Sequence, residues 1–277
     1  MNLVLQGPGA SAAHAAEAAR LCGAREIEQL ADAAFRLLGA GRNAAVIEWC
    51  HEHKLDCAWV PPGRRMADLR LVAMDMDSTL VTIESIDEMG EMLGIKDRVA
   101  QITAQAMSGE IDYAESLRRR VGLLAGLEEA AMERIWAQRM HLSPGAEALV
   151  RRCRERGIRT LLVSGGFDFF TSRLQRRLGI DAALANALEI ERGRLTGRVL
   201  GPIVDGRAKA EKLREQMRRL GLRPEQALAI GDGANDIPMM SVAGTSIAYR
   251  AKPAVRARAT HALDHAGLDG ALHLFAD

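Results

Sequence analysis

The sequence predicts an α/β protein built on an open parallel sheet, with an inserted helical unit and a small N-terminal α+β unit. Three apolar runs end in small or acidic residues where a helical pattern begins, at 71–75, 159–166 and 227–233. Apolar runs of this length, separated by helical patterns, are typical of strands in a parallel sheet. Because ligands bind beyond the carboxyl ends of such strands, we expect Asp75, Ser164 and Asp232 to share one crevice.

Length and charge narrow the class of protein. The 277 residues suffice for one large α/β domain and one or two smaller units, and 48% of them are hydrophobic, so a buried core can form. Lys and Arg number 37 against 36 Asp and Glu, which leaves a net charge of +1. No global field therefore draws the protein to nucleic acid or to a membrane, and a small-molecule substrate fits better.

Cysteine use and the N-terminus indicate a cytoplasmic protein. The four cysteines include no C-x-x-C pair and are too sparse for a disulfide framework. The first residues carry no basic segment before an apolar stretch, and no uninterrupted apolar run reaches membrane-spanning length. A homodimer is compatible with this composition.

Residues 1–66 are expected to form a separate small unit. A Pro-Pro-Gly segment at 61–63 breaks the chain before the Asp75 strand and marks the boundary. Strands and helices are expected at Asn2–Leu5, Ser11–Leu21, Ala44–His53 and Cys57–Val60. The stretch between the two helices has two interpretations, because its apolar residues fit a helical stripe while Ala34–Leu37 also alternates as a strand.

The chain between Asp75 and Ser164 contains an insertion. Its roughly 90 residues far exceed the dozen or so of a minimal crossover connection. Four stretches have helical spacing, at Met89–Leu93, Val99–Met107, Tyr113–Leu124 and Glu128–Gln138. We therefore expect residues 81–139 to form a helical cap over the crevice, and residues 67–80 and 140–277 to form the sheet domain.

Asp75 and Asp77 lie one residue apart where the first apolar run stops. Side chains two apart in extended chain share a face, so both carboxyls can serve one metal or one reacting centre, and no Lys or Arg neutralises them locally. An Asx turn that closes the strand is the simpler alternative. A calcium loop that begins at Asp75 is excluded, since its sixth and twelfth positions hold Leu80 and Ile86 instead of Gly and Glu.

The SGGFD segment that begins at Ser164 resembles half of a phosphate cradle. A hydroxyl and two unencumbered amides, of Gly165 and its neighbour, lie where a helix begins, and the helix dipole favours an anion there. A glycine turn with a serine N-cap is the alternative. A Walker-type loop is excluded because the sequence holds no G-x-x-x-x-G-K-[ST].

Two further segments supply charge. A basic helix begins near Gly206 and contains Lys209, which can neutralise phosphate, but the residues alone do not distinguish it from the other basic residues of that helix. In the GDGAND loop, Asp232 is suited to bind Mg²⁺ through oxygen, while Asn235 and Asp236 could bind substrate or support the loop. The alternative for this loop is a turn followed by a capped helix.

Together, DMDSTL, SGGFD, Lys209 and GDGAND resemble the four motifs of the haloacid dehalogenase superfamily of phosphotransferases. More narrowly, DMDSTLVTIESIDE, ITAQAMSGEIDYAESLRRRV, VSGGFD, LTG, GDGANDI and IAYRAKP resemble the phosphoserine phosphatase family. The resemblance implies a Rossmann-like core and covers residues 70–277. It leaves out residues 1–66, where larger bacterial relatives sometimes carry a regulatory amino-acid-binding fold, so an ACT-like regulatory unit is the expectation there.

The resemblance implies hydrolysis of O-phospho-L-serine to L-serine, the last step of serine biosynthesis, through an aspartyl phosphate. Asp75 would attack phosphorus, and Asp77 would protonate the departing seryl oxygen and later activate water. Mg²⁺ would be held by Asp75, the backbone carbonyl of Asp77 and Asp232. Ser164, the amide of Gly165 and Lys209 would bind the other phosphoryl oxygens.

Substrate choice is expected to come from the cap. The resemblance assigns Glu84 to the substrate ammonium and Arg120 to its carboxylate. Arg120 is the last of three consecutive arginines, and with about 100° between neighbours on a helix only one of them can point squarely into the crevice. One departure from relatives is Tyr113, which stands where Phe is common and adds a hydroxyl.

Two rival functions remain at this stage. A phosphotransferase of the same fold would pass the phosphoryl group to another alcohol, such as homoserine. A non-catalytic amino-acid sensor is the rival from a different class, and the intact set of charged motif residues argues against it.

Overall fold

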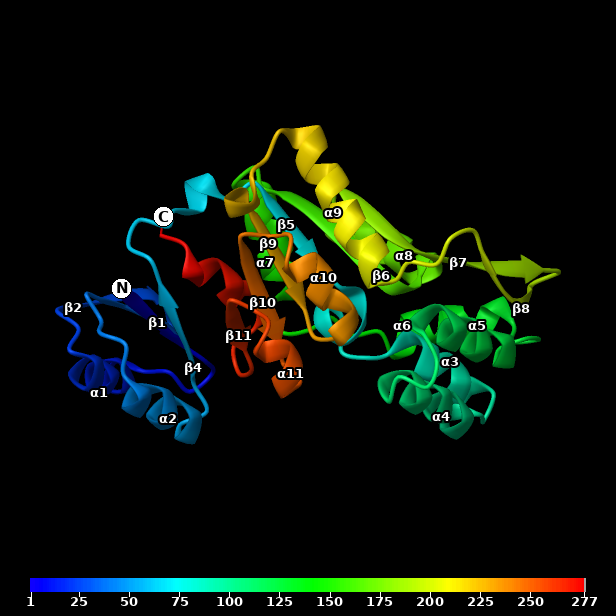
Figure 1. The fold of residues 1–277 in the computed structure, drawn as a ribbon, viewed down its shortest axis with the longest axis horizontal. Coiled ribbons are helices and arrows are strands. Elements are labelled where there is room, and N and C mark those ends of the chain that lie inside the picture. Colours follow the sequence, from blue (N-terminus) through cyan, green and yellow to red (C-terminus); the bar gives the residue numbers. More distant parts are fainter. Residues whose placement is uncertain (277) are drawn as a thin grey trace.

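The computed structural model describes residues 1–276, which form three lobes in a row (Figure 1). The N-terminal unit lies at the left of the view, a large sheet with its helices in the middle, and a group of helices at the right. No helix within residues 1–276 is both long and apolar enough to cross a membrane.

The N-terminal unit is an antiparallel sheet with strand order β2-β3-β1-β4 and two helices. Along the chain its elements are β1 (Asn2–Gln6), α1 (Ala12–Cys22), β2 (Glu26–Ala31), β3 (Ala34–Leu38), α2 (Ala44–Glu52) and β4 (Asp56–Val60). This βαββαβ succession is the ferredoxin-like arrangement. The helices begin at N-caps supplied by Ser11 and Asn43, whose side chains accept from backbone amides.

Between these two helices the chain forms a hairpin, so the helical interpretation of that stretch is wrong and the strand alternative is confirmed. Strand β3 lies between β1 and β2, where Phe35 pairs with Leu5 and Leu37 pairs with Leu3. All four of these side chains are buried. Pairing with a distant strand, which a local pattern does not contain, selects the extended conformation.

The central sheet has seven strands in the order β11-β10-β9-β5-β6-β7-β8. They are β5 (Leu71–Met74), β6 (Arg159–Phe167), β7 (Ala182–Glu191), β8 (Arg194–Leu200), β9 (Ala227–Gly231), β10 (Thr245–Tyr249) and β11 (His261–Leu263). Only the β7–β8 pairing is antiparallel among the described strands of this sheet. The predicted parallel sheet is confirmed, with β5, β6 and β9 as neighbours at its centre.

Helices cover both faces of this sheet (Figure 1). They are α7 (Ala146–Glu155), α8 (Asp168–Leu178), α9 (Gly206–Leu220), α10 (Ile237–Met240) and α11 (Pro253–Arg256). Val72 and Met74 of β5 belong to the same buried cluster as apolar residues of α7 and α8, whereas Leu71 and Ala73 cluster with those of α9 and α10. Strand β5 is therefore buried on both sides, which is why it reads as a continuous apolar run.

The lobe at the right of Figure 1 consists of α3 (Ser85–Met92), α4 (Lys96–Met107), α5 (Tyr113–Leu123) and α6 (Glu129–Gln138). The chain enters and leaves it side by side, because Val81 pairs with Leu142 and the amide of Thr82 donates to the carbonyl of His141 at 3.0 Å. Both connections are thus held together where they meet the sheet domain.

Two buried charges of the N-terminal sheet bond to backbone groups of the sheet domain. The Arg36 guanidinium, 4% exposed, donates to the carbonyls of His273 and Phe275 at 3.1 and 2.7 Å. The Asp56 carboxylate, 6% exposed, accepts from the three consecutive amides of residues 264–266 at 2.8, 3.0 and 2.8 Å. Backbone groups of the sheet domain bond to both charges, and Glu28 also pairs with Arg36 at 3.1 Å. The two units are thus joined by specific bonds and not only by apolar contact.

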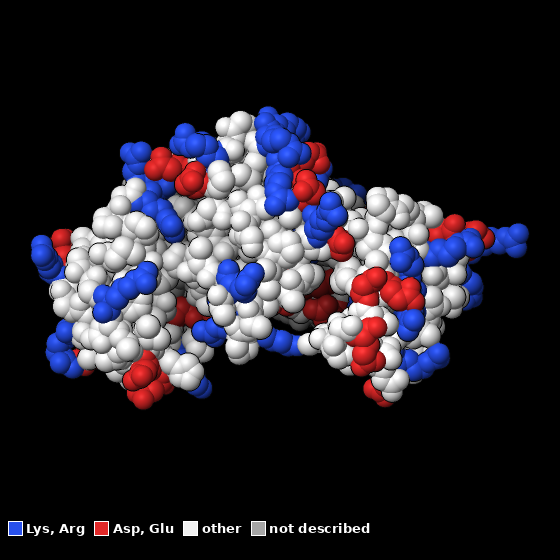
Figure 2. All heavy atoms as spheres, viewed as in Figure 1, with Lys and Arg blue, Asp and Glu red and all other residues white. Residues whose placement is uncertain are grey.

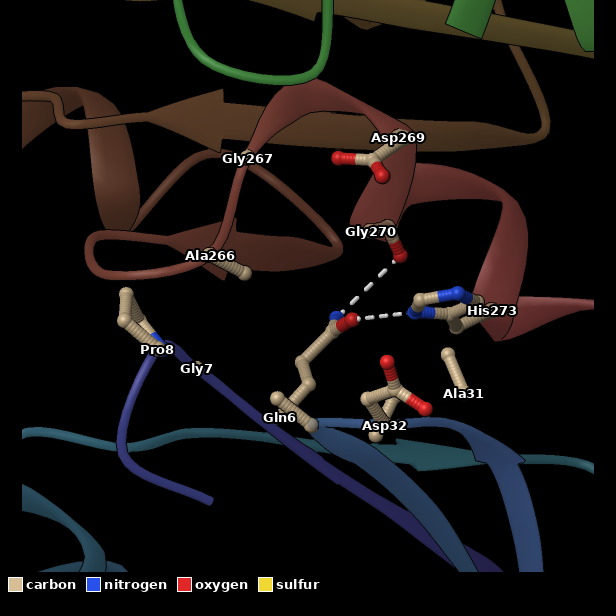
Figure 3. Close-up of a pocket in the computed structure, with 12 residues that line it drawn as sticks. Gln6, Gly7, Pro8, Ala31, Asp32, Ala266, Gly267, Asp269, Gly270 and His273 are labelled. Atoms are coloured by element: carbon tan, nitrogen blue, oxygen red, sulfur yellow. Dashed lines mark hydrogen bonds between the residues drawn. The ribbon is translucent and has the colours of Figure 1, made fainter. Parts of the chain in front are cut away.

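Gln6 lies at the centre of the same junction (Figure 3). Its amide nitrogen donates to the carbonyl of Gly270 at 3.1 Å, and its oxygen accepts from His273 Nδ1 at 2.7 Å. Since a carboxamide oxygen only accepts, His273 carries a proton on Nδ1. A cavity of about 300 Å³ opens beside these side chains, between the N-terminal unit and the sheet domain.

Candidate active site

The first loop of the site follows β5. The Asp75 amide donates to the carbonyl of Ile230 in β9 at 3.0 Å, and Asp75 Oδ1 accepts from the amide of Met76 at 2.8 Å. The chain then turns through Ser78, whose φ of 53° lies in the left-handed region. This turn leads to the start of α3, where Ser85 bonds to Asp77.

Asp77 is held by Ser85 alone among the described side chains and amides. Its Oδ1 accepts from the Ser85 amide at 3.1 Å and its Oδ2 from the Ser85 hydroxyl at 3.0 Å. Burial, together with the negative charge of Glu84, raises the pKa of Asp77 to about 8. At neutral pH this carboxyl can therefore carry a proton.

Lys209 lies at the centre of the site and is 0% exposed. Its Nζ is 2.7 Å from Asp75 Oδ1 and 2.7 Å from Asp236 Oδ1. Burial opposes the charge of Lys209, but Asp236 and Asp75 outweigh burial and raise its pKa, so the side chain is an ammonium. Two other basic residues of α9 pair with glutamates at the surface instead, Lys212 with Glu215 and Arg214 with Glu211.

Three carboxyls converge beside this ammonium. Oxygen atoms of Asp75, Asp232 and Asp236 all lie within 4.8 Å of one another. Thr79 Oγ1 donates to Asp232 Oδ1 at 2.8 Å, and the Gly233 amide donates to Asp236 Oδ2 at 3.0 Å. Burial raises the pKa of Asp232 to about 7 and that of Asp75 well above its usual value.

The charge balance of this group fits a divalent cation. Ionised Asp75, Asp232 and Asp236 carry three negative charges against the single positive charge of Lys209. Burial without enough positive charge is the reason that the pKa values of Asp75 and Asp232 rise. Carboxylate oxygens are the ligands that Mg²⁺ prefers. The carboxylate of Asp77 does not belong to the group, since Ser85 holds it elsewhere.

Ser164 and two glycines form the second loop, at the end of β6. Ser164 is fully buried, and its Oγ accepts from the Gly166 amide at 2.8 Å. A Cβ on Gly166 would lie 2.5 Å from Asp77 Oδ2, and one on Gly165 would lie 2.0 Å from the hydroxyl of Tyr113. A side chain at either position would displace Asp77 or Tyr113, because the loop runs directly against Asp77 and the cap.

The two specificity candidates lie on the cap side of the site. Ser78 Oγ donates to Glu84 Oε1 at 2.6 Å. Arg118 and Arg119 are exposed, and Arg119 pairs with Glu115 at 2.7 Å, whereas Arg120 is half-buried. Burial raises the pKa of Glu84, and the Ser78 hydrogen bond and the charge of Arg120 oppose that rise.

Arg120 also acts on Asp87. Burial raises the pKa of Asp87, and Arg120 opposes that rise. Of the three arginines, Arg120 is thus the one whose charge acts on Glu84 and Asp87. Figure 2 shows acidic atoms in the recess between the sheet domain and the helical lobe.

Asn235 lies half-buried in the loop after β9, and the backbone at Gly233 and Gly206 approaches it closely. A Cβ on Gly233 would lie 2.2 Å from Asn235 Oδ1, and one on Gly206 would lie 2.7 Å from the Asn235 carbonyl. The loop that carries Asp232 and the start of α9 thus touch through this residue, which fixes Lys209 relative to the acids.

Sequence reasoning missed several residues that hold these groups in place. Thr79 and Ser85 bond to Asp232 and Asp77, but a hydroxyl next to a motif has no distinguishing pattern. Asn186, on β7, donates to the carbonyls of Gly165 and Gly166 and has no motif around it at all. Such partners are found only from the fold.

Known proteins match this chain in the region of the site. The model of the haloacid dehalogenase-like hydrolase family matches residues 72–241. The chain belongs to this family. A second model, described as a domain of unknown function (DUF4072), matches residues 3–46.

Among these hydrolases, the chain is 51% identical over 219 residues to a phosphoserine phosphatase of Albidiferax ferrireducens, an alignment that covers 77% of this chain and 92% of the relative. It is 46% identical over 202 residues to a phosphoserine phosphatase of Archaeoglobus fulgidus, covering 73% of this chain and 58% of the relative.

Solved structures agree with the fold. A haloacid dehalogenase family hydrolase of Salmonella enterica serovar Typhi superposes with a TM-score of 0.88 at 30% identity, over 100% of this chain and 98% of that one. A probable phosphoserine phosphatase of Vibrio cholerae gives 0.87 at 31% identity, over 99% and 85%. A substrate-bound phosphoserine phosphatase gives 0.70 at 37% identity, over 75% and 98%. The first two similarities include the N-terminal unit.

Proposed function

We propose that this chain is a Mg²⁺-dependent phosphoserine phosphatase of the cytoplasm, which releases L-serine and phosphate in the last step of serine biosynthesis. The relatives with that name support the proposal. The observation that carries it is the meeting of Asp75, Lys209 and Asp232 at the strand ends, below a cap lobe that presents Glu84 and Arg120. One site thus offers groups for a phosphate and for both charges of an amino acid.

In this proposal Asp75 is the nucleophile. Its Oδ1 is occupied by the Met76 amide and by Lys209, which leaves Oδ2 to attack phosphorus. Burial raises the pKa of Asp75, the ammonium of Lys209 opposes that rise, and a bound metal ion would add the further positive charge that favours the carboxylate. Attack forms an aspartyl phosphate and breaks the bond between phosphorus and the seryl oxygen, and water then cleaves the aspartyl phosphate to release phosphate and restore Asp75.

Asp77 serves as the general acid and base. Its raised pKa of about 8 lets it hold a proton at neutral pH and give that proton to the seryl oxygen as serine departs. The resulting carboxylate then removes a proton from the attacking water. Ser85, which bonds to both of its oxygens, keeps the carboxyl oriented through both steps.

Asp75, Asp232 and the backbone carbonyl of Asp77 would hold the metal ion, with Asp236 in a supporting role. Both Asp236 oxygens are already used, one by Lys209 and the other by the Gly233 amide, so Asp236 orients Lys209 instead. When bound, Mg²⁺ supplies positive charge to the phosphoryl oxygens as their charge shifts. Ser164, Gly165, Lys209 and Asn235 complete the phosphate site.

Glu84 and Arg120 would bind the ammonium and the carboxylate of phosphoserine. A zwitterion needs both signs, and the charge of Arg120 acts on the carboxyl of Glu84, so the two groups interact. We infer that residues 81–139 are the cap, that residues 67–80 and 140–277 are the catalytic core, and that residues 1–66 form a separate ACT-like domain.

Phosphate release from a panel of small phosphomonoesters, with and without Mg²⁺, tests the proposal. We expect O-phospho-L-serine to be hydrolysed with the highest kcat/KM, and EDTA to abolish turnover. Asp75→Asn should remove activity on every ester, because the amide is no nucleophile for phosphorus. A higher kcat/KM for an ester without an amino-acid head, or substantial turnover by Asp75→Asn, would contradict the assignment.

A further inference from the structure

Strand β6 leaves its regular pairing where it carries the phosphate loop. Val163 pairs with Leu184 and Phe167 with Asn186, so three residues of β6 stand opposite one residue of β7. A bulge of this kind removes backbone groups from the ladder, and they need other partners. The carbonyls of Gly165 and Gly166 lie in this bulge.

Asn186 replaces the lost ladder bonds with its side chain. It is 1% exposed, and its Nδ2 donates to the Gly165 carbonyl at 2.8 Å and to the Gly166 carbonyl at 3.3 Å. Its Oδ1 accepts from the Val204 amide at 2.8 Å. The orientation of the amide follows from these partners, since a flipped amide would place an oxygen against two carbonyl oxygens.

A second donor reaches the same carbonyl from the cap. The Tyr113 hydroxyl, at the start of α5, donates to the Gly165 carbonyl at 3.2 Å. Gly165 is therefore held by one donor from the sheet and one from the cap. A carbonyl oxygen has two lone pairs, so both bonds can form together.

These bonds determine how Ser164 is presented. The peptide unit between Gly165 and Gly166 has its carbonyl on one side and the Gly166 amide on the other, and that amide donates to Ser164 Oγ at 2.8 Å. Fixing the carbonyl thus fixes the amide, and the amide fixes the serine oxygen. Because Oγ accepts from this amide, its own proton is free to point to a phosphoryl oxygen.

Asn186 also connects the loop to the lysine. Val204 immediately precedes Asp205, the N-cap residue of α9, and the Lys209 amide donates to the Asp205 carbonyl at 2.9 Å. One side chain therefore spans two of the segments assigned to phosphate binding, the Ser164 loop and the beginning of the Lys209 helix.

We propose that Asn186 and Tyr113 are positioning residues that act together on the Gly165 carbonyl, so that closure of the cap completes the phosphate site. This proposal rests on the proposed phosphatase function. Neither residue touches the reacting atoms. With one donor removed, the other still holds the carbonyl, whereas removal of both leaves the peptide unit free to rotate away from Ser164.

A double-mutant cycle tests the proposal. The variants are Tyr113→Phe, Asn186→Leu and the double variant, where Leu is close to Asn in size, removes the amide donor and places no oxygen against the two carbonyls. We expect kcat/KM to fall by roughly 3-fold in each single variant and by on the order of 100-fold in the double, well beyond the product of roughly 10-fold, since a misplacement of about 1 Å can cost 100-fold.

The substrates separate this proposal from the function on which it rests. Both phosphoserine and p-nitrophenyl phosphate should show the losses, because the phosphate site serves every ester. If the wild type prefers another ester, the proposed function fails, yet the cycle can still be read with p-nitrophenyl phosphate. The competitive inhibition constant of inorganic phosphate should rise in parallel, a change that a smaller folded fraction would not cause.

Tyr249→Phe is the matched control. Tyr249 is the other tyrosine, it lies on β10 outside the groups assigned to catalysis, and removal of its hydroxyl should leave the kinetics unchanged. Thermal melting of each variant reports on folding. Losses that simply multiply in the double variant, or an unchanged inhibition constant for phosphate in folded protein, would overturn the proposal.

Discussion

The choice of Arg120 among three consecutive arginines is the sharpest test of the substrate assignment. Arg118 and Arg119 are exposed and Arg119 is paired with Glu115, whereas half-buried Arg120 acts on Glu84 and Asp87. We predict that Arg120→Ala lowers kcat/KM for phosphoserine and that Arg119→Ala does not. The two variants remove the same group one residue apart, so each controls for the other.

The expected size of this effect is that of an ion pair between Arg120 and the substrate carboxylate. Two unit charges about 4 Å apart interact by about 4 kcal/mol at an effective dielectric constant of 20. Arg120 is partly exposed to solvent, which screens the pair and lowers this value to about 2–3 kcal/mol. At about 1.4 kcal/mol per tenfold, kcat/KM for phosphoserine should fall roughly 30- to 150-fold.

The assay compares phosphoserine with p-nitrophenyl phosphate, which has no carboxylate. Because Arg120 is assigned to the carboxylate alone, the aryl ester should keep its kcat/KM within about twofold, and the ratio of the two constants should carry the whole change. Equal losses on both esters would refute the assignment, as would an Arg119→Ala variant that loses as much as Arg120→Ala.

Three predictions concern stability. Lys209→Met should lower the free energy of unfolding by about 3–5 kcal/mol, measured by urea denaturation, because it leaves the buried acids of Asp75 and Asp236 without their countercharge. Asp56→Ala should lower the melting temperature, at a cost of about 2–4 kcal/mol, since it strips three amides of their acceptor, while kcat per folded molecule stays unchanged. Burial lowers the pKa of His261 to about 4. The folded chain therefore binds fewer protons there than the unfolded chain between pH 4 and 6.5, and stability should fall by up to about 3 kcal/mol as the pH drops through that window. His261→Gln should flatten the pH dependence in chemical denaturation, and an unaltered slope would contradict this reasoning.

The N-terminal unit shows where local pattern fails. Strands β1 and β4 and both helices fall close to their expected places, because alternation and N-caps are local signals. The hairpin of β2 and β3 does not follow from its own residues, since β2 is mostly exposed and β3 is defined by its pairing with β1. Arg36 and Asp56 bond to residues of the sheet domain that are more than 200 positions away along the chain. The local sequence around Arg36 and Asp56 does not predict these bonds.

The sequence by itself determined the chemistry of the site. Acids, hydroxyls and glycines at the ends of apolar runs identified β5, β6 and β9. Neighbouring parallel strands have their carboxyl ends at the same edge of the sheet, so these residues were expected to meet there. Resemblance to a family selected Lys209 and Arg120 from neighbouring basic residues that the sequence alone does not distinguish.

Only the tertiary structure decided why those two residues differ from their neighbours and which side chains hold the loops. Lys209 is the basic residue of its helix that is buried between Asp75 and Asp236, and Asn186 bonds to a loop 20 positions earlier. Burial and long-range hydrogen bonds depend on which segments meet in space, and the periodicity of a single segment does not encode that meeting.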